Sequence, residues 1–270
     1  MSNNRVVLIT GISSGIGRAM AVQLVQNGFT VFGTCRDADQ MTDLEGIEVL
    51  SLDVTDEASV DACVEHVVQA AGHIDILVNN AGQLLLGAIE DTCMEEAKAQ
   101  FETNFFGVVR MTQAVLLHMR RQQHGHIVNI SSVAGLVGVP FIGFYSAGKF
   151  ALEGFSEALW HEVKPLGINV SLVEPGFINT LIGNHAVVVP ASIKDYSPAR
   201  ENFAHAYHEH LQSSPGPESV ADDVVRIVNT RTPKLRYRSG WKAGLIFYLS
   251  RLIPERLLVM AMRKEFQLNR

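Results

Sequence analysis

The stretch of sequence that decides the fold is RVVLITGISSGIGRAMAVQLVQNG, residues 5–28. Its first six residues form a short, almost continuously apolar run, which is typical of a strand buried on both faces of a parallel sheet. Three glycines follow close together, at Gly11, Gly15 and Gly17. Residues 18–26 then show the apolar spacing of a helix. A strand, a glycine-rich turn and a helix in this order predict a unit that binds a dinucleotide.

The glycine-rich turn has a physical reason to bind phosphate. Glycine permits a tight turn and a close approach of the backbone, and the N-terminus of the following helix offers N–H groups and a positive dipole to a pyrophosphate. Glycines also gather in plain turns, which is the alternative interpretation. The strand before the turn and the helix after it favour the binding interpretation.

Arg36 bears on which dinucleotide is bound. In proteins that bind NAD, an acidic residue about 20 residues after the glycines commonly binds the ribose 2′-hydroxyl. Here that place holds Cys35, and Arg36 follows it. A guanidinium suits the 2′-phosphate of NADP through forked hydrogen bonds. The alternative is an ordinary surface arginine at a strand end, and Asp37 beside it leaves that alternative open. We expect NADP(H) in preference to NAD(H).

The rest of the chain alternates strands and helices. Such alternation predicts an α/β fold with helices on both faces of a parallel sheet of about seven strands. The sequence shows no linker, repeat or low-complexity tract, so residues 1–270 are expected to form one domain. Apolar runs predict the further strands at residues 29–35, 47–52, 74–78, 126–130, 168–173 and 235–238.

Tyr145 and Lys149 have the spacing of an acid/base pair. Residues four apart share one helix face, one turn above the other. A nearby ammonium favours the phenolate, so Lys149 is expected to lower the pKa of Tyr145 from about 10 towards neutral pH. A tyrosine tuned in this way passes a proton to or from an alcohol or carbonyl oxygen. The same spacing occurs on many solvated helix faces, so the context has to decide.

Polar clusters follow several of the predicted strands. Asn79-Asn80-Ala81-Gly82 follows the fourth strand and is either a simple turn or a backbone ledge that faces a ligand. Ser131-Ser132 ends the fifth strand, and Glu174-Pro175-Gly176 ends the sixth. Asn104 lies inside a long predicted helix, 93–121, where asparagine is unfavourable. An asparagine at such a position has either no special role or a functional one.

Composition argues against several classes of protein. The net charge is −6 with both signs interspersed, which gives no basic stripe for nucleic acid. The three cysteines lie far apart, without the spacing of a zinc site or a disulfide framework. No apolar run approaches the roughly 18 residues of a membrane-spanning helix, and no signal-peptide layout precedes the first strand. We expect a cytoplasmic protein.

Two groups of side chains have an ordinary explanation beside a functional one. The first group is three histidines, His205, His208 and His210. No cysteine or matching carboxylate set accompanies them, so a metal site is a weak prediction and we expect no metal. The second group is aromatic, and its members are candidates for an apolar pocket or for ordinary core packing: Phe141, Phe144, Phe177 and Tyr207.

Two segments depart from the regular alternation. Residues 177–215 are a loop-rich insertion that is expected to cover the substrate, because long connections at the carboxyl edge of such a sheet usually do. The tail, about residues 241–266, is densely apolar with interspersed basic residues, and Pro254 divides it into two expected short helices. The tail is a lid over the substrate, a contact between subunits, or a peripheral membrane contact.

Together these motifs resemble those of one family, the short-chain dehydrogenase/reductases. The resemblance covers about residues 5–180, and it is to the branch of the family whose members have a single domain. It implies a three-layer, doubly wound Rossmann fold. Residues 236–240, RYRSG, and the apolar tail are similar to members that act on hydroxysteroids, retinoids or other lipophilic ketones. The motifs that carry the resemblance are Gly11-x-x-x-Gly15-x-Gly17, Asn79-Asn80-Ala81-Gly82, Asn104, Ser132, Tyr145-x-x-x-Lys149 and Pro175-Gly176.

The resemblance also implies roles for individual residues. Tyr145 would be the acid/base, Lys149 would lower its pKa and hold the nicotinamide ribose, and Ser132 would hydrogen-bond the substrate oxygen. Asn104 would hold a water in a proton relay that passes through Lys149. Positions that would line the cofactor are Gly11, Ser13, Ser14, Gly15, Ile16, Gly17, Arg36, Asp53, Val54, Asn80, Ala81, Gly82, Tyr145, Lys149, Pro175, Gly176, Ile178 and Thr180.

We therefore expect an NADP(H)-dependent oxidoreductase, a carbonyl reductase that interconverts a ketone or aldehyde and an alcohol. Its substrate would be hydrophobic, such as a steroid, a retinoid or a polyketide. An NAD-linked secondary-alcohol dehydrogenase is the alternative if Arg36 is incidental. A catalytically silent nucleotide-binding sensor or scaffold is the alternative from another class, and the complete set of catalytic residues argues against it. Family members are usually homodimers or homotetramers, so the resemblance implies such an assembly.

Overall fold

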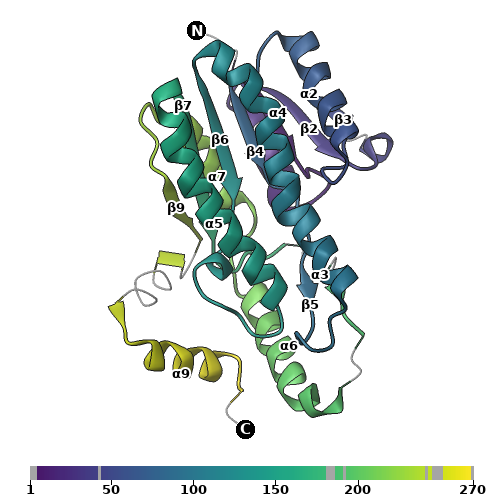
Figure 1. Ribbon diagram of the computed structural model, residues 1–270, viewed down its shortest axis with the longest axis vertical. Coiled ribbons are helices and arrows are strands. Elements are labelled where there is room, and N and C mark those ends of the chain that lie inside the picture. Colours follow the sequence, from purple (N-terminus) through teal and green to yellow (C-terminus); the bar gives the residue numbers. More distant parts are fainter. Residues whose placement is uncertain are drawn as a thin grey trace.

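Seven parallel strands form the central sheet (Figure 1) of the computed structural model, which describes residues 5–41, 44–180, 186–190, 193–240, 243–244 and 252–268. The strands are β1 (Val6–Thr10), β2 (Thr30–Cys35), β3 (Ile47–Ser51), β4 (Ile76–Asn79), β6 (Gly125–Ile130), β7 (Ile168–Pro175) and β9 (Arg236–Ser239). Their order is β3-β2-β1-β4-β6-β7-β9, and each neighbouring pair is parallel. The chain reverses its direction of travel across the sheet between β1 and β4, which is where open α/β sheets bind ligands.

Helices cover both faces of the sheet and complete three layers (Figure 1). Leu8 and Ile9 are adjacent in β1, point to opposite faces and are both fully buried. The core around Ile9 includes side chains of α1 and α7, and the core around Leu8 includes side chains of α2, α4 and α5. The helices are α1 (Gly15–Gln26), α2 (Glu57–Ala71), α4 (Gly107–Gln122), α5 (Gly143–Val163) and α7 (Glu218–Val228).

The predicted α/β fold with a parallel sheet is confirmed, and most element bounds differ from the prediction by one to three residues. The helix after the glycine-rich turn begins at Gly15 instead of residue 18, because the second and third glycines already belong to it. Helix α2 begins after Asp56, whose carboxylate caps it by accepting a hydrogen bond from Ala58 N at 3.2 Å.

One helix prediction is wrong in detail. The stretch 93–121 is not a single α-helix, because α3 (Met94–Phe101) and α4 are joined by a π-helical turn at Glu102–Phe106. Such turns insert an extra residue into a helix and frequently lie at functional sites. Asn104 lies in this turn and is 1% exposed. The residue that suits a helix interior poorly therefore lies where the α-helical pattern is interrupted.

An aromatic cluster joins α6 (Ser197–Gln212) to α9 (Glu255–Glu265) beyond the end of the sheet (Figure 1). The Phe203 ring centroid lies 4.9 Å from that of Phe266 and 5.5 Å from that of Tyr207. From the same side of α9, Leu258 and Met262 pack against this cluster. The second of the two helices expected in the tail is thus confirmed. Most of the stretch expected to form the first lies outside the described residues.

Part of the expected insertion is also described. Strand β8 (Val187–Val188) pairs in parallel with β5 (Leu85–Leu86) and forms a second, two-stranded sheet. Residues 181–185 and 191–192 of the insertion lie outside the described residues. Among the helices of the described residues, none combines the length and apolar composition that crossing a bilayer requires.

A buried histidine lies at the start of β6. His126 is 7% exposed, and its Nε2 atom lies 2.9 Å from Ser171 Oγ. The Ser171 hydroxyl donates its own proton to Lys234 O at 2.8 Å, so the neutral ring has to donate through Nε2–H. Burial, followed by the positive charges of Arg5 and Lys164, lowers the pKa of His126 to about 4.

This histidine predicts a loss of stability in mild acid. The pKa is lower in the folded chain than the unfolded value of about 6.5, so the unfolded chain binds more protons between these values. As the pH falls from about 6.5 to about 4, the free energy of unfolding should decrease by about 3 kcal/mol through His126 alone. Urea denaturation at pH 7 and pH 4.5 measures this decrease in the free energy of unfolding. His126→Gln keeps a donor without titrating, so an equally steep loss in that variant would contradict the prediction.

Candidate active site

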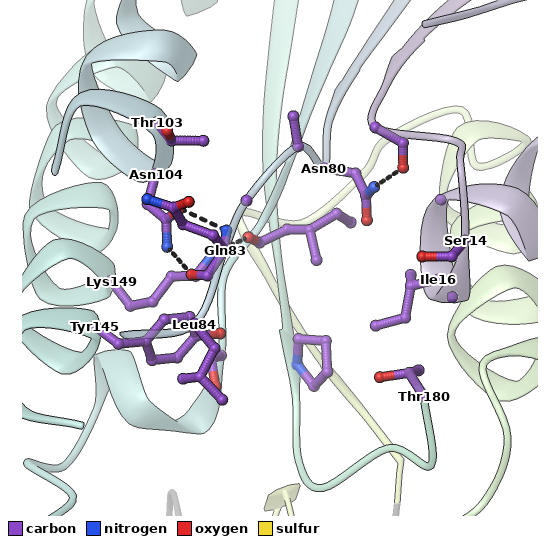
Figure 2. Close-up of a pocket in the computed structure, with 18 of the residues that line it drawn as sticks. Ser14, Ile16, Asn80, Gln83, Leu84, Thr103, Asn104, Tyr145, Lys149 and Thr180 are labelled. Atoms are coloured by element: carbon purple, nitrogen blue, oxygen red, sulfur yellow. Dashed lines mark hydrogen bonds between the residues drawn. The ribbon is translucent and has the colours of Figure 1, made fainter. Parts of the chain in front are cut away.

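A cavity of about 780 Å³ lies beyond the carboxyl ends of the strands. Figure 2 shows Tyr145, Lys149 and Asn104 on one side of it and Ser14 and Thr180 on the other. Every catalytic and cofactor-binding residue predicted from the sequence lines this one cavity. They are Gly11, Ser13, Ser14, Gly15, Ile16, Gly17, Arg36, Asp53, Val54, Asn80, Ala81, Gly82, Asn104, Ser132, Tyr145, Lys149, Pro175, Gly176, Ile178 and Thr180.

Two positions of the glycine-rich turn, Gly11 and Gly17, have no room or no suitable backbone conformation for a side chain. Gly11 has a φ of +74°, which a side chain rarely allows. Gly17 already has helical geometry, but a Cβ atom there would lie 2.0 Å from Gly11 O and 2.4 Å from Asn80 Nδ2. The first turn of α1 therefore packs directly on the backbone of the loop that precedes it.

Asn80 ties the glycine-rich turn to the segment after β4. Its Nδ2 atom donates to Thr10 O at 3.0 Å and to Gly11 O at 2.8 Å. In return, Thr10 Oγ1 accepts from the backbone N–H groups of Asn80 and Ala81, both at 3.0 Å. The cluster expected to be either a simple turn or a ledge beside a ligand is thus a structural tie that also lines the cavity.

The N-terminus of α1 has the chemistry to hold an anion. Ser14 occupies the N-cap position, yet its side chain makes no capping hydrogen bond, and the first turn of the helix contains no acidic residue. The N–H groups of a first helical turn have no partner within the helix, and the helix dipole adds positive charge there. Because Ser14, Gly15 and Ile16 line the cavity, this end fits the pyrophosphate of a dinucleotide.

The other end of the cavity carries a cation beside an acid. Arg36 is exposed at the end of β2, and Asp53 follows β3. Asp53 accepts hydrogen bonds from Thr55 N at 2.9 Å and Thr55 Oγ1 at 2.7 Å. These two bonds, more than the nearby Arg36, lower the pKa of Asp53 and keep it ionised at neutral pH. Arg36 thus lines the cavity beside an acid that already has partners.

Tyr145 and Lys149 occupy the first turns of α5. Lys149 is 7% exposed, and its Nζ atom donates to Ile130 O at the end of β6, at 2.7 Å. Burial lowers the pKa of Lys149 to about 8, although Glu153 acts in the opposite direction. Ser132 Oγ accepts a hydrogen bond from Ala134 N at 3.1 Å, and its O–H is a donor to Tyr145.

The expected depression of the pKa of Tyr145 is wrong for the chain by itself. Burial raises the pKa of Tyr145 to about 12, and the hydrogen bond with Ser132 only moderates the rise. The Lys149 ammonium lies 5.6 Å from the centre of the Tyr145 ring and is occupied by Ile130 O. Desolvation of the phenolate therefore outweighs the attraction of the lysine, and Tyr145 is protonated at neutral pH.

Asn104 uses both the oxygen and the nitrogen of its side-chain amide to fix one segment of the cavity wall. Its Nδ2 donates to Gln83 O at 2.8 Å, and its Oδ1 accepts from Gln83 N at 2.9 Å. Both bonds are visible between the labelled residues in Figure 2. The side chain thus holds the backbone after Gly82 through one donated and one accepted hydrogen bond.

The cavity becomes apolar near Tyr145. Phe177 and Tyr207 line it, as the sequence suggested, whereas Phe141 and Phe144 do not. Phe141 packs on Phe203 instead, with ring centroids 5.4 Å apart. The aliphatic part of the wall carried no sequence signal, because isolated leucines and valines look alike in the core and in a pocket. These residues are Leu84, Val139, Ile142, Val187 and Leu211.

The three histidines of α6 each have a separate partner. His205 lies 3.6 Å from Glu209, His208 lies 2.8 Å from Gln212, and His210 lies 3.1 Å from Glu265. Within the part of the chain that the structure describes, no three histidine, cysteine or acidic side chains are grouped as a metal would require. His210 also stacks on Phe177, with ring centroids 4.9 Å apart. These contacts join α6 and α9 to the wall of the cavity.

Comparison with known proteins identifies the family. Residues 5–187 match the short chain dehydrogenase family, and the chain belongs to it. A 3-ketodihydrosphingosine reductase from Bacteroides thetaiotaomicron is 37% identical over 267 residues, which are 96% of this chain and 97% of the relative. Human retinol dehydrogenase 8 is 37% identical over 257 residues, with 87% and 81% of the two chains covered.

Solved structures show the same fold. A short-chain dehydrogenase from Streptomyces avermitilis has a TM-score of 0.83 and 35% identity, covering 99% of this chain and 97% of its own. A relative from Burkholderia phymatum in complex with NAD has a TM-score of 0.80 and 25% identity, with 96% of both chains covered. ElxO with NADP bound has a TM-score of 0.73 and 28% identity, covering 87% of this chain and 95% of its own.

The packing of the glycine-rich turn predicts a sharp effect of one methyl group. Gly17→Ala would force apart α1 and the backbone of Gly11, so we expect dinucleotide binding to weaken by more than about tenfold and stability to fall by about 1–3 kcal/mol. Titration of protein fluorescence with NADPH and thermal melting measure the two effects. Gly154→Ala is the matched control, because its Cβ atom would meet nothing within 4 Å in α5. Equal affinity in the two variants would contradict the prediction.

Proposed function

We propose that this protein is an NADP(H)-dependent oxidoreductase that interconverts a ketone or aldehyde and an alcohol, with Tyr145 as the acid/base. One observation carries the proposal: Tyr145 and Lys149 share a single cavity with the glycine-rich turn and the uncapped end of α1. A proton donor and a site suited to a dinucleotide in the same cavity are what reduction of a carbonyl requires.

The residues present fit a nicotinamide dinucleotide. The turn at Gly11 and the N-terminus of α1 would hold its pyrophosphate, and Asp53 and Val54 would line its adenosine end. Lys149 would hold the nicotinamide ribose, and the segment 175–180 would line the nicotinamide. When bound, the nicotinamide supplies or accepts the hydride. The chain itself has to orient the substrate, exclude water and move the proton.

Tyr145 is poised to donate in the direction of reduction. Its phenol is protonated at neutral pH, because burial raises the pKa to about 12. When a substrate is bound, the O–H of Ser132 would donate to the same substrate oxygen and stabilise the negative charge that develops on it. Lys149 stabilises the phenolate that Tyr145 leaves, and a water beside Asn104 would return the proton through Lys149. In oxidation the same steps run in reverse.

Arg36 supports NADP(H) over NAD(H). Arg36 lines the cavity where β2 ends, and Asp53, the acid beside it, already accepts two hydrogen bonds from Thr55. A fork of N–H groups at this place suits a 2′-phosphate, whereas a 2′-hydroxyl would be better served by an acceptor. Solved relatives bind either NAD or NADP, so the choice depends on residues of this chain.

The substrate we propose is a lipophilic carbonyl compound. The wall near Tyr145 is built from Leu84, Val139, Ile142, Phe177 and Tyr207. Relatives covering most of this chain are named for a long-chain sphingoid ketone and for retinol. A sphingoid-like, retinoid-like or steroid-like ketone therefore has the right chemistry for this wall.

We also propose that residues 1–270 act as one domain in a homo-oligomer formed through α4 and α5. Leu117 in α4 and Phe150 in α5 support this assembly, because 42% and 46% of their surfaces are exposed. Apolar side chains exposed on two long helices of one layer are typical of a contact between subunits.

Removal of one hydroxyl group tests the chemical role. Tyr145→Phe keeps the ring but cannot donate a proton, so kcat for ketone reduction should fall by about 10²- to 10⁴-fold. The Kd of NADPH should change less than about threefold. Tyr196→Phe is the matched control, because Tyr196 lies outside the cavity wall and bonds Glu90 at 2.7 Å. Turnover that survives Tyr145→Phe would refute the role of acid/base and favour a nucleotide-binding sensor.

Loss of the guanidinium tests the choice of cofactor. Arg36→Gln should weaken NADPH binding by roughly 10- to 100-fold. This factor corresponds to the loss of about 1.5–3 kcal/mol, which is typical of a hydrogen bond to a charged group. NADH binding should stay the same, since NADH carries no 2′-phosphate. Calorimetric titration with both nucleotides measures the change, with Arg121→Gln in the last turn of α4 as a control for charge. Equal weakening of both nucleotides, or tighter binding of NADH by the wild type, would favour the NAD-linked alternative.

A further inference from the structure

A carboxylate lies directly behind the catalytic lysine. Glu153 follows Lys149 by four residues in α5 and therefore occupies the same helix face one turn further on. Both residues are buried, with 6% and 7% of their surfaces exposed. Glu153 does not line the cavity, whereas Lys149 does. The acid is thus placed to act on the lysine without contact with substrate or cofactor.

An arginine from the edge of the sheet fixes this carboxylate. Arg236 Nε donates to Glu153 Oε2 at 3.1 Å, and Arg236 Nη2 donates to Glu157 Oε2 at 2.8 Å. Arg236 Nε also lies 3.5 Å from Glu174, which in turn lies 3.6 Å from Arg238. The register of β7 and β9 places Glu174 opposite Arg238. Charges of alternating sign therefore run from Lys149 through Glu153 and across two strands.

The two buried charges depend on each other. Removal of Lys149 from water disfavours its ammonium form, and a single hydrogen bond to Ile130 O is a partial replacement for hydration. Glu153 raises the pKa of Lys149 against the effect of burial. Arg236 acts on Glu153 in the corresponding way, since burial raises the pKa of this acid while Ser131 and Arg236 lower it. The guanidinium favours the ionised acid, and the ionised acid favours the ammonium.

We propose that Glu153, held by Arg236, is a positioning residue that keeps Lys149 charged behind Tyr145. This inference rests on the proposed function for the role of Lys149 in catalysis, but the charge on Lys149 is measurable without catalysis. The groups that face Glu153 are Lys149 and Glu157 from α5, Arg236 from β9 and Glu174 from β7. Tyr145 is the titratable group on the cavity side of Lys149.

The sign of the effect follows from these neighbours. Replacement of the carboxylate by an amide removes the negative charge that favours the ammonium of Lys149, so the ammonium loses its proton at a lower pH. The expected displacement is about one pH unit, the lower end of the range that a neighbouring opposite charge produces. At neutral pH a larger fraction of Lys149 is then uncharged, and the phenolate of Tyr145 loses its stabilising partner.

The titration of Lys149 in the full-length protein without nucleotide tests the proposal. NMR of protein labelled with ¹³C at lysine Cε follows the ammonium, and Lys149→Arg identifies the signal by its loss. We expect a midpoint near pH 8 in the wild type and about one unit lower in Glu153→Gln. Glu157→Gln is the matched control, because Glu157 also bonds Arg236 but its side chain is 55% exposed. Its midpoint should equal that of the wild type.

Further variants keep the test decisive. Glu153→Asp retains the charge and should restore most of the shift. If Glu153→Gln does not fold, Glu153→Met removes the charge with an apolar chain of similar length, a replacement that buried ion pairs often tolerate. A folded variant without the carboxylate whose Lys149 titrates as in the wild type overturns the proposal.

The pH profile of ketone reduction separates this inference from the proposed function. The alkaline decline of kcat should begin about one pH unit lower in Glu153→Gln and at the wild-type pH in Glu157→Gln. A lower Lys149 midpoint with an unchanged profile would overturn the positioning role while the oxidoreductase function stands. Turnover by Tyr145→Phe would refute the proposed function instead, and the NMR titration of Lys149 would still report the effect of Glu153.

Discussion

A buried ammonium group, that of Lys149, is the constraint on which the site depends. The carbonyl of Ile130 at the end of β6 accepts a hydrogen bond from this ammonium. The position of the group is therefore set by the strand as well as by helix α5, which carries the lysine. Tyr145 lies one turn earlier on the same face of α5, so it faces the cavity as well. Because a buried cation needs compensation, the layer behind it carries Glu153 and Arg236. The residues that face the cavity and the ion pairs behind Lys149 therefore depend on each other.

The nucleotide half of the cavity is built on a different principle, that of close backbone contact. Gly17 lets α1 approach the loop before it, and Asn80 ties that loop to the segment after β4. Asn104 in turn fixes the segment after Gly82 from its π-helical turn. Amide side chains thus connect the glycine-rich turn to the segment after β4, and that segment to the π-helical turn.

Sequence reasoning predicted the parallel sheet and the residues that meet in the cavity, because the apolar runs and the glycine spacing are set by local physics. It did not predict the π-helical turn at Asn104, since the residues on both sides of this turn are helical. The sign of the pKa change of Tyr145 was also missed, because spacing reveals the neighbouring charge but not the burial. The apolar residues of the cavity wall and Arg236, the partner of Glu153, depend on contacts distant in sequence, which no local pattern encodes.

The measurement that tests the central claim most directly is the origin of the hydrogen that reaches the carbonyl carbon. The protein would be mixed with NADPH deuterated at C4 of the nicotinamide and with lipophilic ketones or aldehydes, including 3-ketodihydrosphingosine and retinal. The alcohol would be analysed by mass spectrometry, and the reaction repeated in D₂O with unlabelled NADPH. The account predicts one deuterium at the carbinol carbon from the nucleotide and none from solvent. A carbinol hydrogen derived from solvent, or tight binding of NADPH with no alcohol from any compound, would contradict it.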